Sequence, residues 1–150
     1  MAGVRFKVRT DPIATGTSAK TLLQIKAASN HSVLVEEVSI AFAGTNNTHA
    51  PIRVDILRQT TAGTMTTSAS TIVKDPDDAS ETLQTTRADS ASAEPTASDI
   101  LMTQYVHPQT GFTWQARYRG EIKVGGGDYL GVRVTAANDV NAVVTLVGEE

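Results

Sequence analysis

Hydrophobic and polar residues alternate along much of this chain, most clearly between Val33 and Gln59. The alternation runs over residues 38–43, stops, and resumes over residues 52–56. A period of two places successive side chains on opposite faces of a strand, so each run can bury one face. The interruption contains the turn formers Gly44, Asn46, Asn47 and Pro51. The pattern predicts two long antiparallel strands joined by a short loop, with the rest of the chain layered against this pair.

The first of these strands changes phase along its length. Val33 and Val35 share one parity, whereas the apolar residues from position 38 onward have the other. One extra residue near Glu36 and Glu37 would restore a single apolar face, which is what a β-bulge does. The alternative is that Leu34 faces inward with the later set and Glu36 lies at the rim.

The N-terminal segment predicts a strand with one basic face. Val4, Phe6 and Val8 alternate with Arg5, Lys7 and Arg9, and turn formers follow. Such a strand can lie at a sheet edge, where charge blocks unwanted pairing. It can also be an arm that joins a neighbouring subunit. We therefore divide the chain into an N-terminal strand or arm, residues 1–19, and a single β-sandwich domain, residues 20–150.

The middle of the chain differs in composition. Residues 20–28 favour a further strand, but residues 60–99 are dominated by Thr, Ser, Ala and Asp. This stretch is longer than a plain loop of about 12–15 residues. Within it, Thr71 to Lys74 and Glu81 to Thr86 have the β propensity of short strands. The prediction is an ordered, polar excursion with short edge strands.

Strand patterns return after this excursion. They cover residues 100–107, 112–118, 122–124, 129–135 and 141–147, with turn signals at residues 108–111, 125–128 and 136–139. Many short strands with turns between them, and no convincing helix, indicate a sandwich or barrel. We predict an all-β antiparallel sandwich of the jelly-roll type with a long polar mid-chain excursion. An immunoglobulin-like sandwich is the alternative.

Composition limits the function classes. A chain of 150 residues without Cys needs no disulfide framework and has no Cys-bearing zinc site. The net charge of −3, with both signs interspersed, favours neither nucleic acid nor an anionic membrane as a partner. The N-terminus has no long apolar run, so we expect no signal peptide and no transmembrane helix.

No motif in the sequence predicts catalysis. His31, His49 and His107 have no second ligand at metal spacing. The acidic run Asp75, Asp77 and Asp78 lacks the turn glycine and terminal glutamate of a helix–loop–helix calcium loop. Glycines 125–127 precede a strand, whereas a phosphate cradle needs a helix N-terminus. We therefore expect a protein that is not an enzyme, with no cofactor and no metal.

Aromatic residues gather in one predicted strand. Phe112, Trp114 and Tyr118 share its parity. They can belong to the core, where large apolar side chains usually lie. They can also form a subunit interface, where aromatic residues are enriched.

A resemblance to tailed-phage structural proteins is carried by the segments PIRVDILRQTTAGTMT, ETLQTT, AEPT, VHPQTGF and GGGDYLGVRVTA with VNA. These segments look like those of capsid decoration, or cement, proteins of the jelly-roll type. They extend from about Pro51 to Ala142 and contain no catalytic signature.

The resemblance implies a homotrimer on the outside of an icosahedral head, whose partner besides itself is the major capsid protein. It implies a virion protein assembled in the host cytoplasm. The segment Arg5, Phe6, Lys7 and Arg9 becomes a candidate capsid contact, from its charge and position alone. Two other functions stay open, namely a tail or baseplate module that binds a receptor or glycan and, less favoured, an enzyme.

Overall fold

The computed structural model describes residues 3–66, 70–74 and 81–150, and these residues form an all-β fold. The first strands are β1 (Arg5–Thr10), β2 (Ile13–Ala14), β3 (Lys20–Lys26), β4 (Val33–Phe42), β5 (Ile52–Gln59), β6 (Thr64–Thr66) and β7 (Ser70–Lys74). The later strands are β8 (Thr86–Ala93), β9 (Ala97–Val106), β10 (Gly111–Gln115), β11 (Ile122–Val124), β12 (Tyr129–Thr135) and β13 (Asn141–Glu149).

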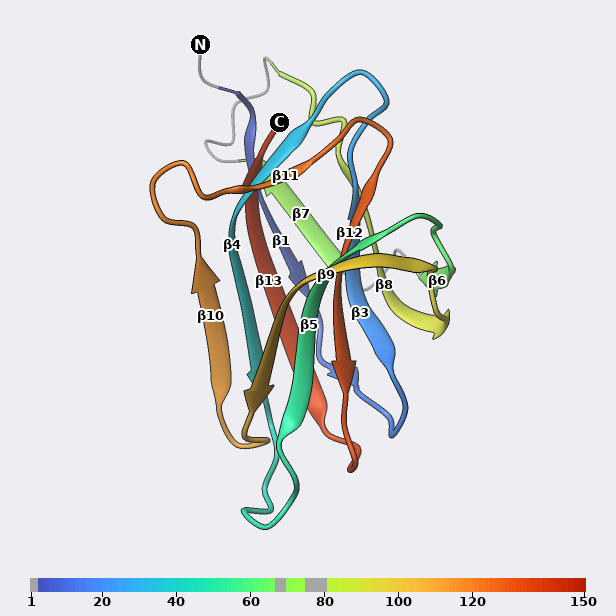
Figure 1. The fold of residues 1–150 in the computed structure, drawn as a ribbon, viewed down its shortest axis with the longest axis vertical. Coiled ribbons are helices and arrows are strands. Elements are labelled where there is room, and N and C mark those ends of the chain that lie inside the picture. Colours follow the sequence, from blue (N-terminus) through green and yellow to red (C-terminus); the bar gives the residue numbers. More distant parts are fainter. Residues whose placement is uncertain (1–2, 67–69, 75–80) are drawn as a thin grey trace.

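These strands form two antiparallel sheets that pack as a sandwich (Figure 1). The seven-stranded sheet has the order β10-β4-β13-β1-β7, with β11 also paired to β4 and β2 to β13. The six-stranded sheet has the order β6-β8-β3-β12-β5-β9. The predicted all-β antiparallel sandwich is confirmed, whereas the jelly-roll form of its wiring stays a prediction.

The core lies between the sheets and follows the period of two. In β1 the burial alternates, with Phe6 and Val8 fully buried and Arg5, Lys7 and Arg9 exposed. Strands from both sheets supply the rest of this apolar cluster, including Ile40, Ile56, Val132 and Leu146. One hydrophobic face on each sheet is therefore what holds the sandwich together.

The predicted pairing of the two long central strands is wrong. β4 and β5 lie in opposite sheets, and β4 pairs instead with β13, β10 and β11. Both strands bury one apolar face, but they bury it from opposite sides of the same core. Periodicity fixes which face of a strand is buried and leaves open whether the next strand lies beside it or across from it.

The predicted bulge in β4 is confirmed. Against β13, Glu37 pairs with Val147 and Val35 pairs with Gly148, so Glu36 is the extra residue. As a result Val33, Val35, Val38, Ile40 and Phe42 all face the core. The alternative with Leu34 facing inward is wrong, because Leu34 is 39% exposed.

The N-terminal strand does not lie at a sheet edge. β1 pairs with β13 on one side and with β7 on the other. The edge prediction is wrong because β7, which comes from the polar mid-chain stretch, covers that side. β1 and β2 both belong to the seven-stranded sheet, so this sheet includes strands from residues 1–19.

The mid-chain stretch is ordered where the structure describes it. The short strand predicted at Thr71 to Lys74 is confirmed as β7. The strand predicted at Glu81 to Thr86 is wrong, since β8 begins only at Thr86 and continues to Ala93. The acidic run Asp75, Asp77 and Asp78 lies outside the described residues.

Candidate functional site

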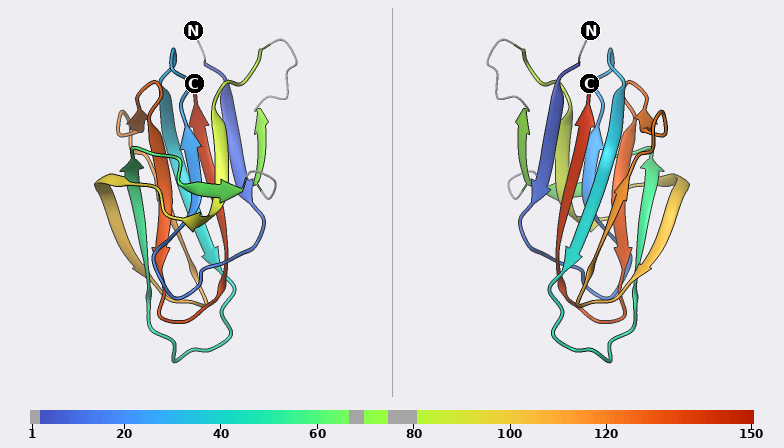
Figure 2. Two further views of the ribbon diagram at one scale, coloured as in Figure 1. Left: turned by 90° about the vertical axis from the view of Figure 1, so that its right-hand side faces the viewer. Right: turned by 90° about the vertical axis from the view of Figure 1, so that its left-hand side faces the viewer.

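The candidate site is the exposed surface of the edge strand β9. Among the described residues its only strand partner is β5, so its other edge is unpaired. Eight of its ten residues are exposed. In the views of Figure 2 this gold strand stands at the margin of the sandwich. A long strand with a free edge can accept another strand.

Large apolar side chains are concentrated on β9. The exposed fractions are 47% for Ile100, 38% for Leu101 and 65% for Tyr105. These are three of the six exposed large hydrophobic residues in the described part of the chain. Asp99 is the only charged residue of the strand. The consecutive apolar residues Ile100, Leu101 and Met102 break the alternation and could have signalled this surface, but only a strand over residues 100–107 was predicted from them.

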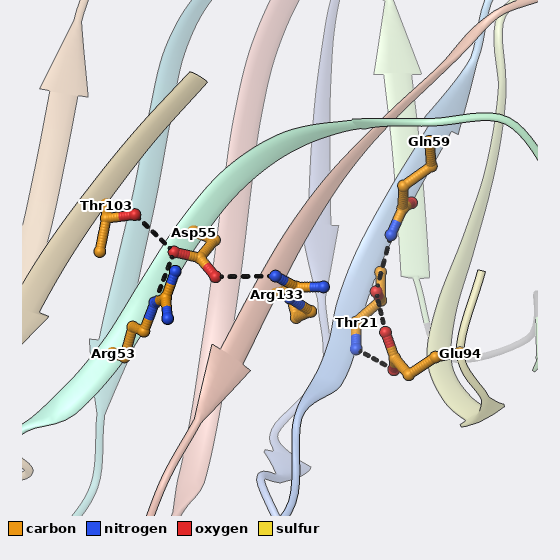
Figure 3. A network of polar contacts seen from close by, with 7 residues as sticks. All are labelled: Thr21, Arg53, Asp55, Gln59, Glu94, Thr103 and Arg133. Atoms are coloured by element: carbon orange, nitrogen blue, oxygen red, sulfur yellow. Dashed lines mark hydrogen bonds and ion pairs between the residues drawn. The ribbon is translucent and has the colours of Figure 1, made fainter. Parts of the chain in front are cut away.

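A buried polar network lies on the outer face of the six-stranded sheet (Figure 3). Asp55 points outward from β5 but is only 1% exposed. Its Oδ1 accepts hydrogen bonds from Arg53 Nε at 3.0 Å and from Thr103 Oγ1 at 2.7 Å, and its Oδ2 accepts one from Arg133 Nη2 at 3.0 Å. The network therefore ties β9 and β12 to the strand between them.

The charge of Asp55 is stabilised by these donors. Burial raises the pKa of Asp55, but hydrogen bonds from Thr103, Arg133 and Arg53 together outweigh burial and hold the pKa below its ordinary value. Both oxygens accept hydrogen bonds from within the protein, so this carboxylate is poorly suited to act as a base. We assign it a structural role.

A second group of buried polar side chains lies on the same outer face. Gln59 donates from Nε2 to Thr21 Oγ1 at 2.9 Å, and its Oε1 accepts from Gln24 Nε2 at 2.7 Å. Thr21 donates in turn to the Glu94 carboxylate, with Oγ1 at 2.7 Å from Oε2 (Figure 3). Gln24 also donates to the carbonyl of Thr61 at 3.0 Å. These contacts hold residues around Thr61 and Glu94 against the sheet.

The candidate capsid-contact residues do not share one face. Arg5, Lys7 and Arg9 are exposed on the outer face of the seven-stranded sheet, and Arg5 Nη2 lies 2.9 Å from Glu36 Oε2. Phe6 is fully buried in the core, so its side chain cannot contact a partner in this fold. The period of two separates Phe6 from its neighbours, and only the three basic residues are accessible.

The aromatic residues are also separated. Phe112 and Trp114 pair with Ile40 and Val38, point inward and pack partly buried against the core. β10 ends at Gln115, and Tyr118 in the following loop is 89% exposed. The Arg119 guanidinium lies 5.4 Å from the centre of the Tyr118 ring. The alternation seen over residues 112–118 therefore does not correspond to one continuous strand.

The histidines and the glycine turn, which were weighed as metal or phosphate sites, do not come together in the structure. His107 accepts a hydrogen bond from the backbone N–H of Gln109 at its own turn, and His31 is exposed. Gly125 and Asp128 close the turn between β11 and β12. The described residues contain no group of three or more His, Asp or Glu that could hold a metal ion. They also contain no helix long and apolar enough to cross a bilayer.

Comparisons of the chain with protein-family models, curated proteins and solved structures found no match.

Proposed function

We propose that this chain is a structural virion protein of a tailed phage, a decoration protein that binds the outer surface of the head as an oligomer. The observation that carries the assembly role is the outer edge of β9, which has no strand partner among the described residues, together with the exposed Ile100, Leu101 and Tyr105. A surface of this kind is suited to binding another protein. The decoration role rests on the sequence segments that resemble phage cement proteins.

The mechanism is thermodynamic. A protein that binds only the expanded lattice stabilises that lattice by mass action. An oligomer binds the lattice more tightly than a single chain because several weak contacts act together. The capsid contact in this proposal is the outer face of β1, where Arg5, Lys7 and Arg9 are exposed beside one another.

Co-sedimentation with expanded and unexpanded heads of the phage that encodes the protein tests this role. We expect the purified protein to pellet with expanded heads, and the charge-reversed variant Lys7→Glu/Arg9→Glu to bind at least about tenfold more weakly. Lys26→Glu/Arg58→Glu, which reverses two exposed charges on strands of the opposite sheet, is the matched control and should bind like the unmodified protein. Failure of the unmodified protein to bind expanded heads would end the decoration proposal.

One observation favours a second candidate, a tail or baseplate module that binds glycans. Tyr118 is 89% exposed and its ring is flanked by Arg119, as in a platform for stacking a sugar. A glycan array with Tyr118→Ala as the matched loss-of-binding variant tests this candidate. Trp114→Ala is a poorer test, because Trp114 packs partly against the core. Binding that disappears with Tyr118 would favour the module over the decoration protein.

A further inference from the structure

An open pocket of about 270 Å³ lies on the outer face of the six-stranded sheet, over β3, β8 and β12. The side chains that line it include Gln24, Lys26, Ala62, Arg87, Ala88 and Tyr129. Gln24 is paired with Gly131 on one side and with Ala88 on the other, and directly opposite residues share a face of the sheet. The Gln59 amide fills the space over Gly131, whereas the small side chain of Ala88 leaves space beside Gln24. The pocket is therefore a consequence of the small residue on β8.

The side-chain amide of Gln24 has an unused acceptor in this pocket. Gln24 is only 3% exposed. Its Nε2 donates to Gln59 Oε1 at 2.7 Å and to the carbonyl of Thr61 at 3.0 Å, and these two acceptors fix the orientation of the amide. Oε1 accepts no hydrogen bond from the described residues and is not sealed from solvent. Because polar atoms of buried side chains normally have a partner, this oxygen is the natural contact point for a ligand.

A line of hydrogen bonds strengthens this acceptor. Gln24 donates to Gln59, and Gln59 donates to Thr21. Thr21 then donates to the carboxylate of Glu94 (Figure 3). All three bonds point in the same direction, towards an anion, so each one polarises the next. Gln24 Oε1 is the acceptor at the open end of this line, and the polarisation makes it a stronger acceptor than an isolated amide oxygen.

The walls of the pocket combine an apolar surface with positive charge. The Tyr129 ring and the methyl groups of Ala62 and Ala88 supply the apolar part. The Lys26 ammonium lies 5.3 Å from the centre of the Tyr129 ring, and Arg87 is a second cationic side chain in the lining. No Asp or Glu of the described residues lines the pocket. A fitting ligand therefore has a hydrogen-bond donor for the amide oxygen, an anionic group for the ammonium and an apolar surface for the ring.

We propose that this pocket binds an acidic sugar residue of the uronic-acid type. A sugar hydroxyl donates to Gln24 Oε1, the sugar carboxylate lies beside the Lys26 ammonium, and the C–H surface of the sugar ring packs against Tyr129. The pocket is smaller than the usual range of about 300–1,000 Å³ for drug-sized ligands, which suits a single sugar ring. A free amino acid fits less well, because its own ammonium group would lie beside two cationic side chains. The inference goes beyond the decoration role and does not rest on it.

Titration of the isotopically labelled protein with methyl glucuronide, followed by NMR, tests the site. We expect saturable shifts in the side-chain amide signals of Gln24 and in the backbone amide signals of Lys26 and Ala88. Methyl glucoside, which has no carboxylate, should bind at least about threefold more weakly. No saturable shift, or shifts confined to Tyr118 and its neighbours, would overturn the proposal. Equal binding of the two sugars would overturn the assignment of an acidic sugar.

Two variants and a control test the parts of the pocket. Ala88→Leu fills the pocket and should abolish the shifts. Ala41→Leu, at an exposed position of β4 in the other sheet, is the matched control and should bind like the unmodified protein. Lys26→Gln changes an exposed side chain and should remove the preference for the charged sugar, while the Gln24 signals still respond. Unchanged glucuronide binding in a folded Ala88→Leu variant, verified by circular dichroism, would overturn the site.

The Lys26→Gln variant keeps the proposal testable if Ala88→Leu does not fold, because a preference for glucuronide that survives the loss of the ammonium contradicts the proposed contact. Co-sedimentation with heads decides the decoration role on its own. A protein that binds expanded heads but shows no glucuronide shifts would keep the decoration role and end this site. A protein that binds glucuronide in the pocket but ignores expanded heads would keep the site and end the decoration role.

Discussion

The side-chain amide of Gln59 lies directly over Gly131 on the neighbouring strand. A Cβ added at Gly131 would come within 2.4 Å of Gln59 Oε1. Gln59 is only 3% exposed and is held by Thr21 and Gln24. Gly131 thus provides the space in which this buried amide makes its hydrogen bonds.

Gly131→Ala is therefore expected to destabilise the fold. The added methyl group must displace the Gln59 amide, and breaking its buried hydrogen bonds costs about 1–3 kcal/mol. A double-mutant cycle measured by urea unfolding checks the mechanism, because Gly131→Ala should cost much less in a Gln59→Ala background. Equal costs in both backgrounds would show that Gln59 is not the reason for the glycine.

Removal of the Asp55 carboxylate should destabilise the fold more than removal of an exposed one. Asp55→Ala leaves the guanidinium groups of Arg53 and Arg133 without their shared acceptor, and both are only partly exposed. We expect a loss of about 3 kcal/mol in the free energy of unfolding, at the low end for a buried pair because the arginines keep some water. Asp99→Ala is the control. Its pair with Arg58 is exposed and 4.0 Å long, so its loss should cost at most about 1 kcal/mol.

The contribution of Asp55 should depend on pH. Its folded-state pKa is lowered, whereas an aspartate in an unfolded chain has a pKa of about 3.9. The stabilisation is therefore fully present above the unfolded pKa and is lost as the pH falls through the lower folded pKa. Unfolding free energies of the unmodified protein and Asp55→Asn, measured between pH 7 and the acid limit of folding, should converge below about pH 4. A gap that stays constant down to the acid limit would contradict this account.

The strands in which apolar and polar residues alternate with a period of two were predictable from the sequence. The alternation located most strands, and the phase change at Glu36 located the bulge in β4. Both features follow from local geometry, because the pleat of a strand fixes the face on which each side chain lies. The strand with which each strand pairs was harder to predict from the sequence. β4 and β5 are consecutive and equally amphipathic, yet they face each other across the core.

The polar network was missed for a related reason. Asp55 and Gln59 occupy outward positions of β5, so their polarity fitted a solvated face. They are enclosed by side chains that are distant in sequence and lie on the neighbouring strands: Thr103 and Arg133 donate to Asp55, and Gln24 and Thr21 bond Gln59. Such contacts depend on which strands lie side by side in the sheet, which no periodicity encodes.

The position of β1 gives a further prediction. Phe6 is fully buried and also lies against Gly148 of β13, where an added Cβ would be 2.9 Å from Phe6 Cζ. Phe6→Ala should therefore cost about 3–5 kcal/mol in the free energy of unfolding. Lys7→Ala, next to it on the exposed face, should stay within about 0.5 kcal/mol. If Phe6→Ala unfolded with the same midpoint as the unmodified protein, the N-terminal strand would behave as a detachable arm and not as part of the core.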